Sequence, residues 1–155
     1  KHIFQSITQL IGLIVSKHNS LLGVILELLN IVQTIENQAT LVCNIVCSIV
    51  IKFNCPQFIV QLFKELAHTQ SKDMVADTAS SRNCSQFLSA LGKTLPKDVL
   101  NNSSLLMCHL ERDPYPMRNA VLDCFGYVVT QIFSKMTLDD VSRKSRDTFL
   151  DKIQE

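Results

Sequence analysis

The residues that could do chemistry in this sequence are mostly cysteines and histidines, and their spacing favours core packing over catalysis or metal binding. Cys43 and Cys47 lie four residues apart, which places both on one face of a helix. Zinc would need a third and a fourth ligand, and the sequence offers none nearby. Cys108 and His109 are neighbours, so on a helix they point in different directions and form no dyad. We therefore expect reduced thiols that serve as small hydrophobic residues, and no metal or other cofactor.

Two groups of charged residues are further candidates. Asp139 and Asp140 could form an acid–base pair, but adjacent carboxylates are also typical of the first turn of a helix, where they complement the helix dipole. Arg143, Lys144 and Arg146 form the main basic cluster. Because aspartates surround this cluster in the sequence, a solvated and ion-paired face is the simpler interpretation. Contact with a phosphate or a partner is the alternative.

The most specific local pattern runs from residue 113 to residue 126. It has an acid in a turn, an arginine early in the next helix, a small residue and a hydrophobe–glycine pair: Asp113, Arg118, Ala120, Phe125 and Gly126. This pattern resembles the turn and second helix of a HEAT repeat. The aspartate can accept backbone N–H bonds, and the arginine can bond that aspartate or its equivalent in the adjoining repeat. We expect Ala120 and Gly126 to let helices approach closely.

The elements that must position these residues are helices. Gly and Pro number only four each, and no stretch shows convincing strand alternation. A polar connector is expected at 70–83, and Gly92 is expected just beyond a short helix. Apolar residues recur with a helical period in eight stretches: 3–15, 21–35, 42–53, 56–66, 87–91, 96–110, 117–132 and 138–153.

These helices predict an all-α fold, an α-solenoid of HEAT-type antiparallel helix pairs. The chain of 155 residues gives three or four pairs of about 40 residues, the period of HEAT and armadillo repeats. We expect residues 1–155 to form a single segment cut from a longer chain. Only seven of the charged residues lie in the first 70 positions, so the first helices are apolar on more than one face. Such helices must be covered on several sides, by neighbouring repeats or by a partner.

The composition of the chain argues against several classes of function. Lys and Arg number 15 against 14 Asp and Glu, so no basic bias indicates a dedicated DNA-binding module. No uninterrupted apolar run is long enough to cross a membrane. The sequence also lacks the glycine-rich phosphate loops and catalytic motifs of common enzyme families. We therefore expect no enzyme, no membrane partner and no small-molecule substrate.

A narrower resemblance covers the C-terminal third. The run YPMRNAVL at 115–122, LDD at 138–140 and SRDTFLD at 145–151 are similar to the larger HEAT-repeat regulatory subunits of condensin. This similarity is specific over residues 105–155, whereas residues 1–70 match only in helical pattern.

The resemblance implies a long HEAT solenoid without enzymatic activity. It also implies binding to the kleisin subunit, contact with the SMC ATPase subunits and a role in mitotic chromosome condensation. DNA would be held through the whole complex. The expected location is the nucleus and chromosomes, with the cytoplasm in interphase. The alternative is a HEAT or armadillo scaffold of another class, such as a transport receptor or a cohesin-type regulator.

Overall fold

The fold was analysed in a computed structural model. It describes residues 2–18, 21–68, 78–112, 115–132, 143–144, 146–148 and 150–151. Within these ranges no residue lies in a β-strand. Nine helices succeed one another there: α1 (His2–Lys17), α2 (Leu21–Thr34), α3 (Ala39–Phe53), α4 (Pro56–His68), α5 (Ala79–Thr94), α6 (Pro96–Asn101), α7 (Ser103–Leu106), α8 (Cys108–Arg112) and α9 (Tyr115–Gln131).

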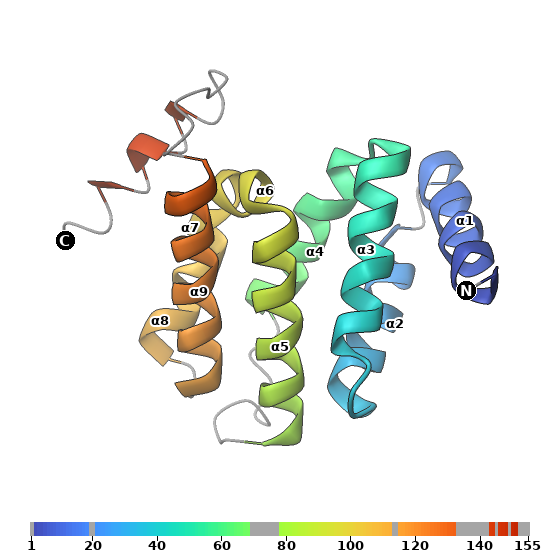
Figure 1. The fold of residues 1–155 in the computed structure, drawn as a ribbon, viewed down its shortest axis with the longest axis horizontal. Coiled ribbons are helices and arrows are strands. Elements are labelled where there is room, and N and C mark those ends of the chain that lie inside the picture. Colours follow the sequence, from blue (N-terminus) through green and yellow to red (C-terminus); the bar gives the residue numbers. More distant parts are fainter. Residues whose placement is uncertain are drawn as a thin grey trace.

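The helices form two rows. Figure 1 shows α1, α3, α5 and α9 side by side, with α1 at one end of the row and α9 at the other. The second row lies behind and contains α2, α4 and the short helices α6 to α8. The rows are joined by contacts of α2 with α5 and of α9 with α6 and α8. This arrangement confirms the predicted all-α array of helix pairs.

The core lies between the two rows. Phe58 and Phe63 of α4 and Phe87 of α5 are completely buried there. They belong to one hydrophobic cluster to which α1 to α7 and α9 contribute buried residues, and the half-buried Leu110 of α8 packs against this cluster. Burying a Phe or Leu side chain contributes about 1.5–3 kcal/mol, so this continuous layer stabilises the stacking of the helices.

Helix α5 is longer than the sequence predicts. The polar connector was expected to run to Asn83, but α5 already begins at Ala79. The Thr78 Oγ1 atom accepts a hydrogen bond from the Ser81 N–H (3.2 Å), and the Thr78 N–H donates to the Ser81 Oγ atom (3.1 Å). This capping box satisfies N–H groups at the helix start and overrides the weak helix propensity of the polar residues. Residues 70–77 of the predicted connector lie outside the described residues.

The glycine predicted just beyond a helix is instead inside one. Gly92 lies within α5, which continues to Thr94. A Cβ atom at this position would lie 3.0 Å from the Cys124 Cα atom and would overlap the Cys124 Sγ atom. Gly92 is therefore required by the close approach of α5 and α9, and the helix end is not its role.

The helix predicted at 96–110 is divided into α6, α7 and α8. Asn102 lies at the first break, where its Nδ2 atom donates to the Asp98 carbonyl oxygen at 2.8 Å. Asparagine side chains compete in this way with backbone hydrogen bonds of a helix, which explains the interruption. The second break falls at Met107.

Two asparagines form the turns around α3. Asn37 precedes the helix with φ of 65° and Asn54 ends it with φ of 47°. Asparagine tolerates this left-handed conformation better than most residues. Helix α9 begins at Tyr115, two residues before the predicted start, because Pro116 is compatible with a first helical turn.

The predicted last helix is described only in short pieces. Residues 143–144, 146–148 and 150–151 are helical. Asp139 and Asp140 lie outside the described residues, so their predicted place at a helix start stays a prediction. No helix in the described ranges is both long and apolar enough to cross a membrane.

Candidate interaction surface

A groove lined mainly by residues with polar side chains lies along the junction of α5 and α9. It has a volume of about 540 Å³ and is open to solvent, and we call it the α5–α9 groove. One wall comes from α5 and the other from α9, and Thr40 of α3 lies at its edge. The walls carry amide, hydroxyl and charged groups: Gln86, Ser89 and Lys93 on α5, and Asn119, Asp123 and Tyr127 on α9.

The two helices run parallel in close contact beneath this groove. The Cys124 thiol donates to the Leu88 carbonyl oxygen at 3.2 Å, and Gly92 lies against Cys124. Ala90 and Ala120 form the floor, and Ala120 is buried. Small floor residues leave the groove open, so its shape follows from the tight packing of α5 on α9.

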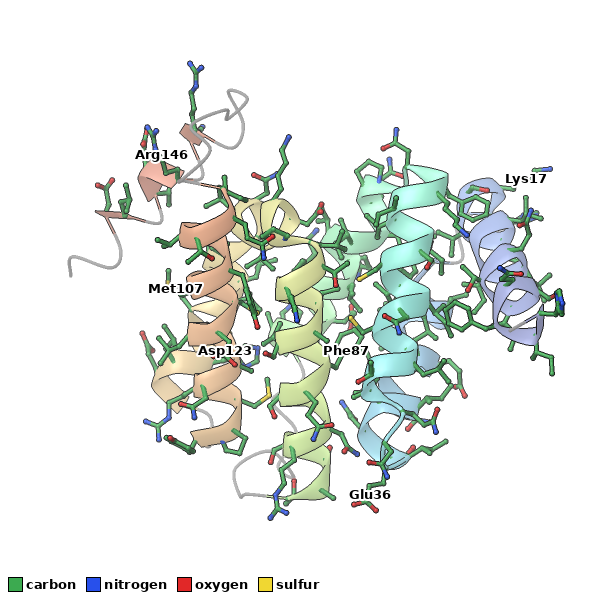
Figure 2. The ribbon with its side chains drawn as sticks, viewed as in Figure 1. Lys17, Glu36, Phe87, Met107, Asp123 and Arg146 are labelled. Carbon is green, nitrogen blue, oxygen red and sulfur yellow. The ribbon has the colours of Figure 1, made fainter. Side chains whose placement is uncertain are left out.

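A hydrogen bond between two side chains joins the walls. The Ser89 hydroxyl donates to the Asp123 Oδ2 atom at 3.1 Å, and Figure 2 shows Asp123 on α9 at its junction with α5. The side chains of Gln86, Lys93 and Asn119 make no hydrogen bond or ion pair within the described part of the chain. Their donors and acceptors are therefore available to a partner.

The residues of the HEAT-like pattern do not form one cluster. Ala120 and Phe125 are buried, as a repeat framework requires, whereas Arg118 is exposed on α9. Gly126 is exposed, and a Cβ atom there would meet nothing within 4 Å. Among the described residues no helix approaches Gly126, so a close approach there stays a prediction, whereas Gly92 does lie in such a contact. Asp113 lies outside the described residues, so its pairing with Arg118 stays a prediction.

The predicted basic cluster lies beyond the end of α9. Arg143 and Lys144 are exposed, and Arg146 is bonded to the carboxylate of Asp147, with 2.6 Å between its Nη2 atom and Oδ1. Figure 2 shows Arg146 at this end of the molecule. The ion pair agrees with a solvated charged face, and its exposure limits its contribution to stability. Contact of this cluster with a phosphate or a partner stays a prediction.

Four of the six cysteines are buried in the core: Cys43, Cys47, Cys84 and Cys124. The Sγ atoms of Cys43 and Cys47 are 3.8 Å apart, and both residues are buried in α3. The hydrogen bond to Cys47 and burial raise the pKa of the Cys43 thiol. Burial raises the pKa of Cys84 and of Cys124 to about 12. Among the described residues, no group of three or more His, Cys, Asp or Glu side chains could hold a metal ion.

A second surface of opposite character lies at the other end of the front row. Thr8, Gly12 and Val15 form the buried face of α1, and Gly12 lies against the Phe53 ring of α3. The other side of α1 carries four exposed apolar residues, which we call the α1 stripe: Ile3 (77% exposed), Ile7 (42%), Leu10 (60%) and Leu13 (41%). The early helices were predicted to be apolar on more than one face, and α1 carries apolar residues on its exposed side as well as Val15 on its buried side.

Comparison with known proteins identifies relatives of this chain. No family model matches it. Condensin complex subunit 1 of Xenopus laevis is 25% identical to this chain over 151 residues, or 97% of the chain. This chain is similar to condensin complex subunit 1 along nearly its whole length. The human condensin complex subunit 1 is 25% identical over 150 residues. Condensin-1 complex subunit CAP-D2 of Arabidopsis thaliana is 24% identical over 140 residues.

These matches confirm the resemblance to condensin subunits and extend it. The sequence motifs placed the specific similarity within residues 105–155, whereas the match to condensin complex subunit 1 also takes in the charge-poor N-terminal helices. The chain spans 11% of the length of the Xenopus and human relatives.

Proposed function

We propose that this chain is a non-catalytic HEAT-type scaffold segment of a condensin regulatory subunit. It would support assembly with the kleisin and SMC ATPase subunits in mitotic chromosome condensation. The observation that carries this proposal is the similarity to condensin complex subunit 1 over 97% of the chain, in an array of helix pairs.

Two surfaces of the segment support a role in protein assembly. The α1 stripe offers exposed apolar area, which supports a contact with other protein. The α5–α9 groove offers the polar side chains of Gln86, Lys93 and Asn119, which make no hydrogen bond within the described chain. A scaffold needs such surfaces and needs no reactive group.

The chemistry of two buried thiols, Cys84 and Cys124, agrees with a non-catalytic role. A cysteine nucleophile acts as a thiolate, and it needs a lowered pKa and access to substrate. Cys84 and Cys124 have the opposite properties, because both are completely buried with a pKa of about 12.

Charge balance supports DNA contact through the whole complex rather than through this segment. With 15 basic and 14 acidic residues, the segment has too little net charge to neutralise a run of phosphates. A condensin role places the protein in the nucleus and on chromosomes, with the cytoplasm in interphase.

Affinity purification of the intact, tagged protein from mitotic cells tests the proposal. We expect both SMC subunits and kleisin at near-equal amounts in the same complex after size-exclusion chromatography. Recovery of transport cargo, or of cohesin-type subunits in their place, would show that the scaffold belongs to another class. An intact protein that elutes without any SMC or kleisin subunit would exclude the condensin role.

A further inference from the structure

We propose that Cys43 and Cys47 form a redox site, which a peroxide converts into a disulfide within α3 and which a thiol reductant restores. The two residues lie one helical turn apart on α3, and their Sγ atoms are in hydrogen-bonding contact at 3.8 Å. The proposal concerns the thiols of this chain alone, so it does not depend on the proposed function.

The helix brings the two sulfur atoms within reach of a covalent bond. Cα atoms four residues apart in an α-helix are separated by about 6 Å, and disulfides span Cα separations of about 4.4–6.8 Å. The Cβ atoms of such a pair are about 5–6 Å apart, whereas a disulfide needs about 3.5–4.5 Å. One turn of α3 must therefore tighten when the bond forms. A disulfide under such strain is easily reduced, which makes the modification reversible.

The environment of Cys47 favours its reaction with an oxidant. A hydrogen bond from the Cys43 thiol lowers the pKa of Cys47, and the nearby Thr94 hydroxyl of α5 also lowers it, while burial opposes both. The thiolate is the nucleophilic form of a cysteine. Cys47 is also the more exposed residue of the pair, at 5% against 1% for Cys43. Cys47 is therefore the attacking thiol, and Cys43 is the thiol that completes the disulfide.

Hydrogen peroxide oxidises the pair in two steps. The Cys47 thiolate attacks one oxygen atom and the O–O bond breaks. The hydroxide that leaves takes up the proton released by Cys47, so a sulfenic acid and a water form. The Cys43 sulfur then attacks the Cys47 sulfur, the S–S bond forms, and the S–O bond breaks as hydroxide leaves with the Cys43 proton as a second water. Two thiols are thus oxidised to one disulfide, and one peroxide is reduced to two waters.

Two other buried thiols lack this environment. Burial raises the pKa of Cys84 and of Cys124 to about 12, and the Cys124 thiol donates to the Leu88 carbonyl oxygen. Both thiols stay protonated at neutral pH and should react slowly. They belong to the same hydrophobic cluster as the pair, so they serve as an internal reference for it.

Differential alkylation of the intact protein tests the proposal. The protein is treated with hydrogen peroxide, its remaining thiols are alkylated after denaturation, and trypsin cleaves after Lys and Arg. Peptide 18–52 then holds Cys43 and Cys47 and no other cysteine, whereas peptides 83–93 and 119–135 hold Cys84 and Cys124. We expect peptide 18–52 to lose its two labels about ten times faster than the other peptides lose theirs. It should regain both labels when a reductant is added before alkylation.

Three variants assign the roles. Cys43→Ala removes the second thiol, so the sulfenic acid of Cys47 should accumulate and be trapped by dimedone. Cys47→Ala removes the attacking thiol, so Cys43 should stay reduced at the same dose of peroxide. Cys84→Ala is the matched control, because it also removes a buried thiol but should leave the oxidation of peptide 18–52 unchanged. Circular dichroism shows which variants fold, and the comparison of wild-type peptides needs none of them.

Three results would overturn the proposal. The first is an equal rate of oxidation for all three peptides of the wild-type protein. The second is a stable sulfenic or sulfinic acid at Cys47 in the wild type, because Cys43 would then fail to complete the bond. The third is a disulfide that joins peptide 18–52 to another peptide, because the two thiols of α3 would then not react with each other.

Discussion

The two ends of the front row differ in what they leave exposed. At the α5–α9 end, Gly92 and Cys124 let two helices approach closely, and the surface above them is polar. At the α1 end, Gly12 lets α1 approach Phe53 of α3, but the outer side of α1 exposes Ile3 and Leu10. At both ends a glycine lets two helices pack closely, so the ends differ in the side chains that their outer surfaces expose.

This comparison separates two kinds of interface. An exposed apolar helix face is a surface for permanent helix packing, because its burial stabilises a fold without needing polar partners. A polar groove over a finished core is suited to a partner that arrives after folding, because the core beneath does not depend on it. The chain therefore has one edge that requires cover and one surface that is available for binding.

The largest expected effect comes from filling the close contact of α5 and α9. Gly92→Val should destabilise the chain by about 3 kcal/mol, because its branched side chain would overlap Cys124. Gly126→Ala is the matched control, since a Cβ atom there meets nothing and alanine favours the helix by up to about 1 kcal/mol. Urea unfolding followed by circular dichroism measures both.

Equal stability of the Gly92→Val variant and the wild type would show that α5 and α9 do not approach closely. The two ends of the front row would then no longer share a close contact between helices at a glycine.

These two glycines also show how far sequence reasoning reaches. Helical periodicity predicted the helices of the two rows, because long apolar stripes specify both helix and buried face. It could not choose between Gly92 and Gly126 as the close-contact residue, because that depends on which turn of one helix meets another. The HEAT-like motif pointed to Gly126, but the contact between the helices falls at Gly92.

The start of α5 and the candidate surface were missed for related reasons. A window of polar residues before Asn83 has weak helix propensity, and the capping box of Thr78 and Ser81 outweighs it. A sequence signal existed in the Thr–x–x–Ser spacing, but Ser is not the Glu or Gln that usually marks a capping box. The α5–α9 groove joins residues more than 30 positions apart, so no local pattern could reveal it.

The second effect concerns the α1 stripe. The isolated 155-residue chain should self-associate through this surface. Replacing Ile3 and Leu10 by Gln should raise the dissociation constant at least about tenfold, because two exposed apolar side chains lose their burial. Ile51→Gln is the control, since Ile51 is 64% exposed on α3, outside the stripe. Sedimentation velocity measures association, and a monomeric wild-type chain at every concentration would contradict this role.

The third effect is a pH dependence from the buried thiols. Cys84 has a pKa of about 12 in the folded chain against 9.0 when unfolded, so only the unfolded thiol ionises between these values. Stability should therefore fall as the pH rises above 9. Between pH 8 and pH 10 the wild type should lose about 1.4 kcal/mol more than Cys84→Ala. Urea unfolding at each pH measures the stability of both proteins. If both lose the same stability as the pH rises, the Cys84 thiol also ionises in the folded chain.

The smallest effect tests the start of α5. Thr78→Ala removes the side-chain acceptor for the Ser81 N–H and should cost about 1 kcal/mol. Thr78→Ser keeps that acceptor and should stay within about 0.5 kcal/mol of the wild type. If both variants lose the same stability in thermal unfolding, the capping box does not hold this helix end.

Hydroxyl-radical footprinting of the intact protein, free and assembled with SMC and kleisin subunits, tests the difference between the two ends most directly. Tyr127 reports on the α5–α9 groove, and Ile3 and Leu10 report on the α1 stripe. We predict that Ile3 and Leu10 are protected in both states, whereas Tyr127 is oxidised in the free protein and protected in the complex. Equal oxidation of Tyr127 in both states, or strong oxidation of Ile3 and Leu10 in the intact protein, would contradict it.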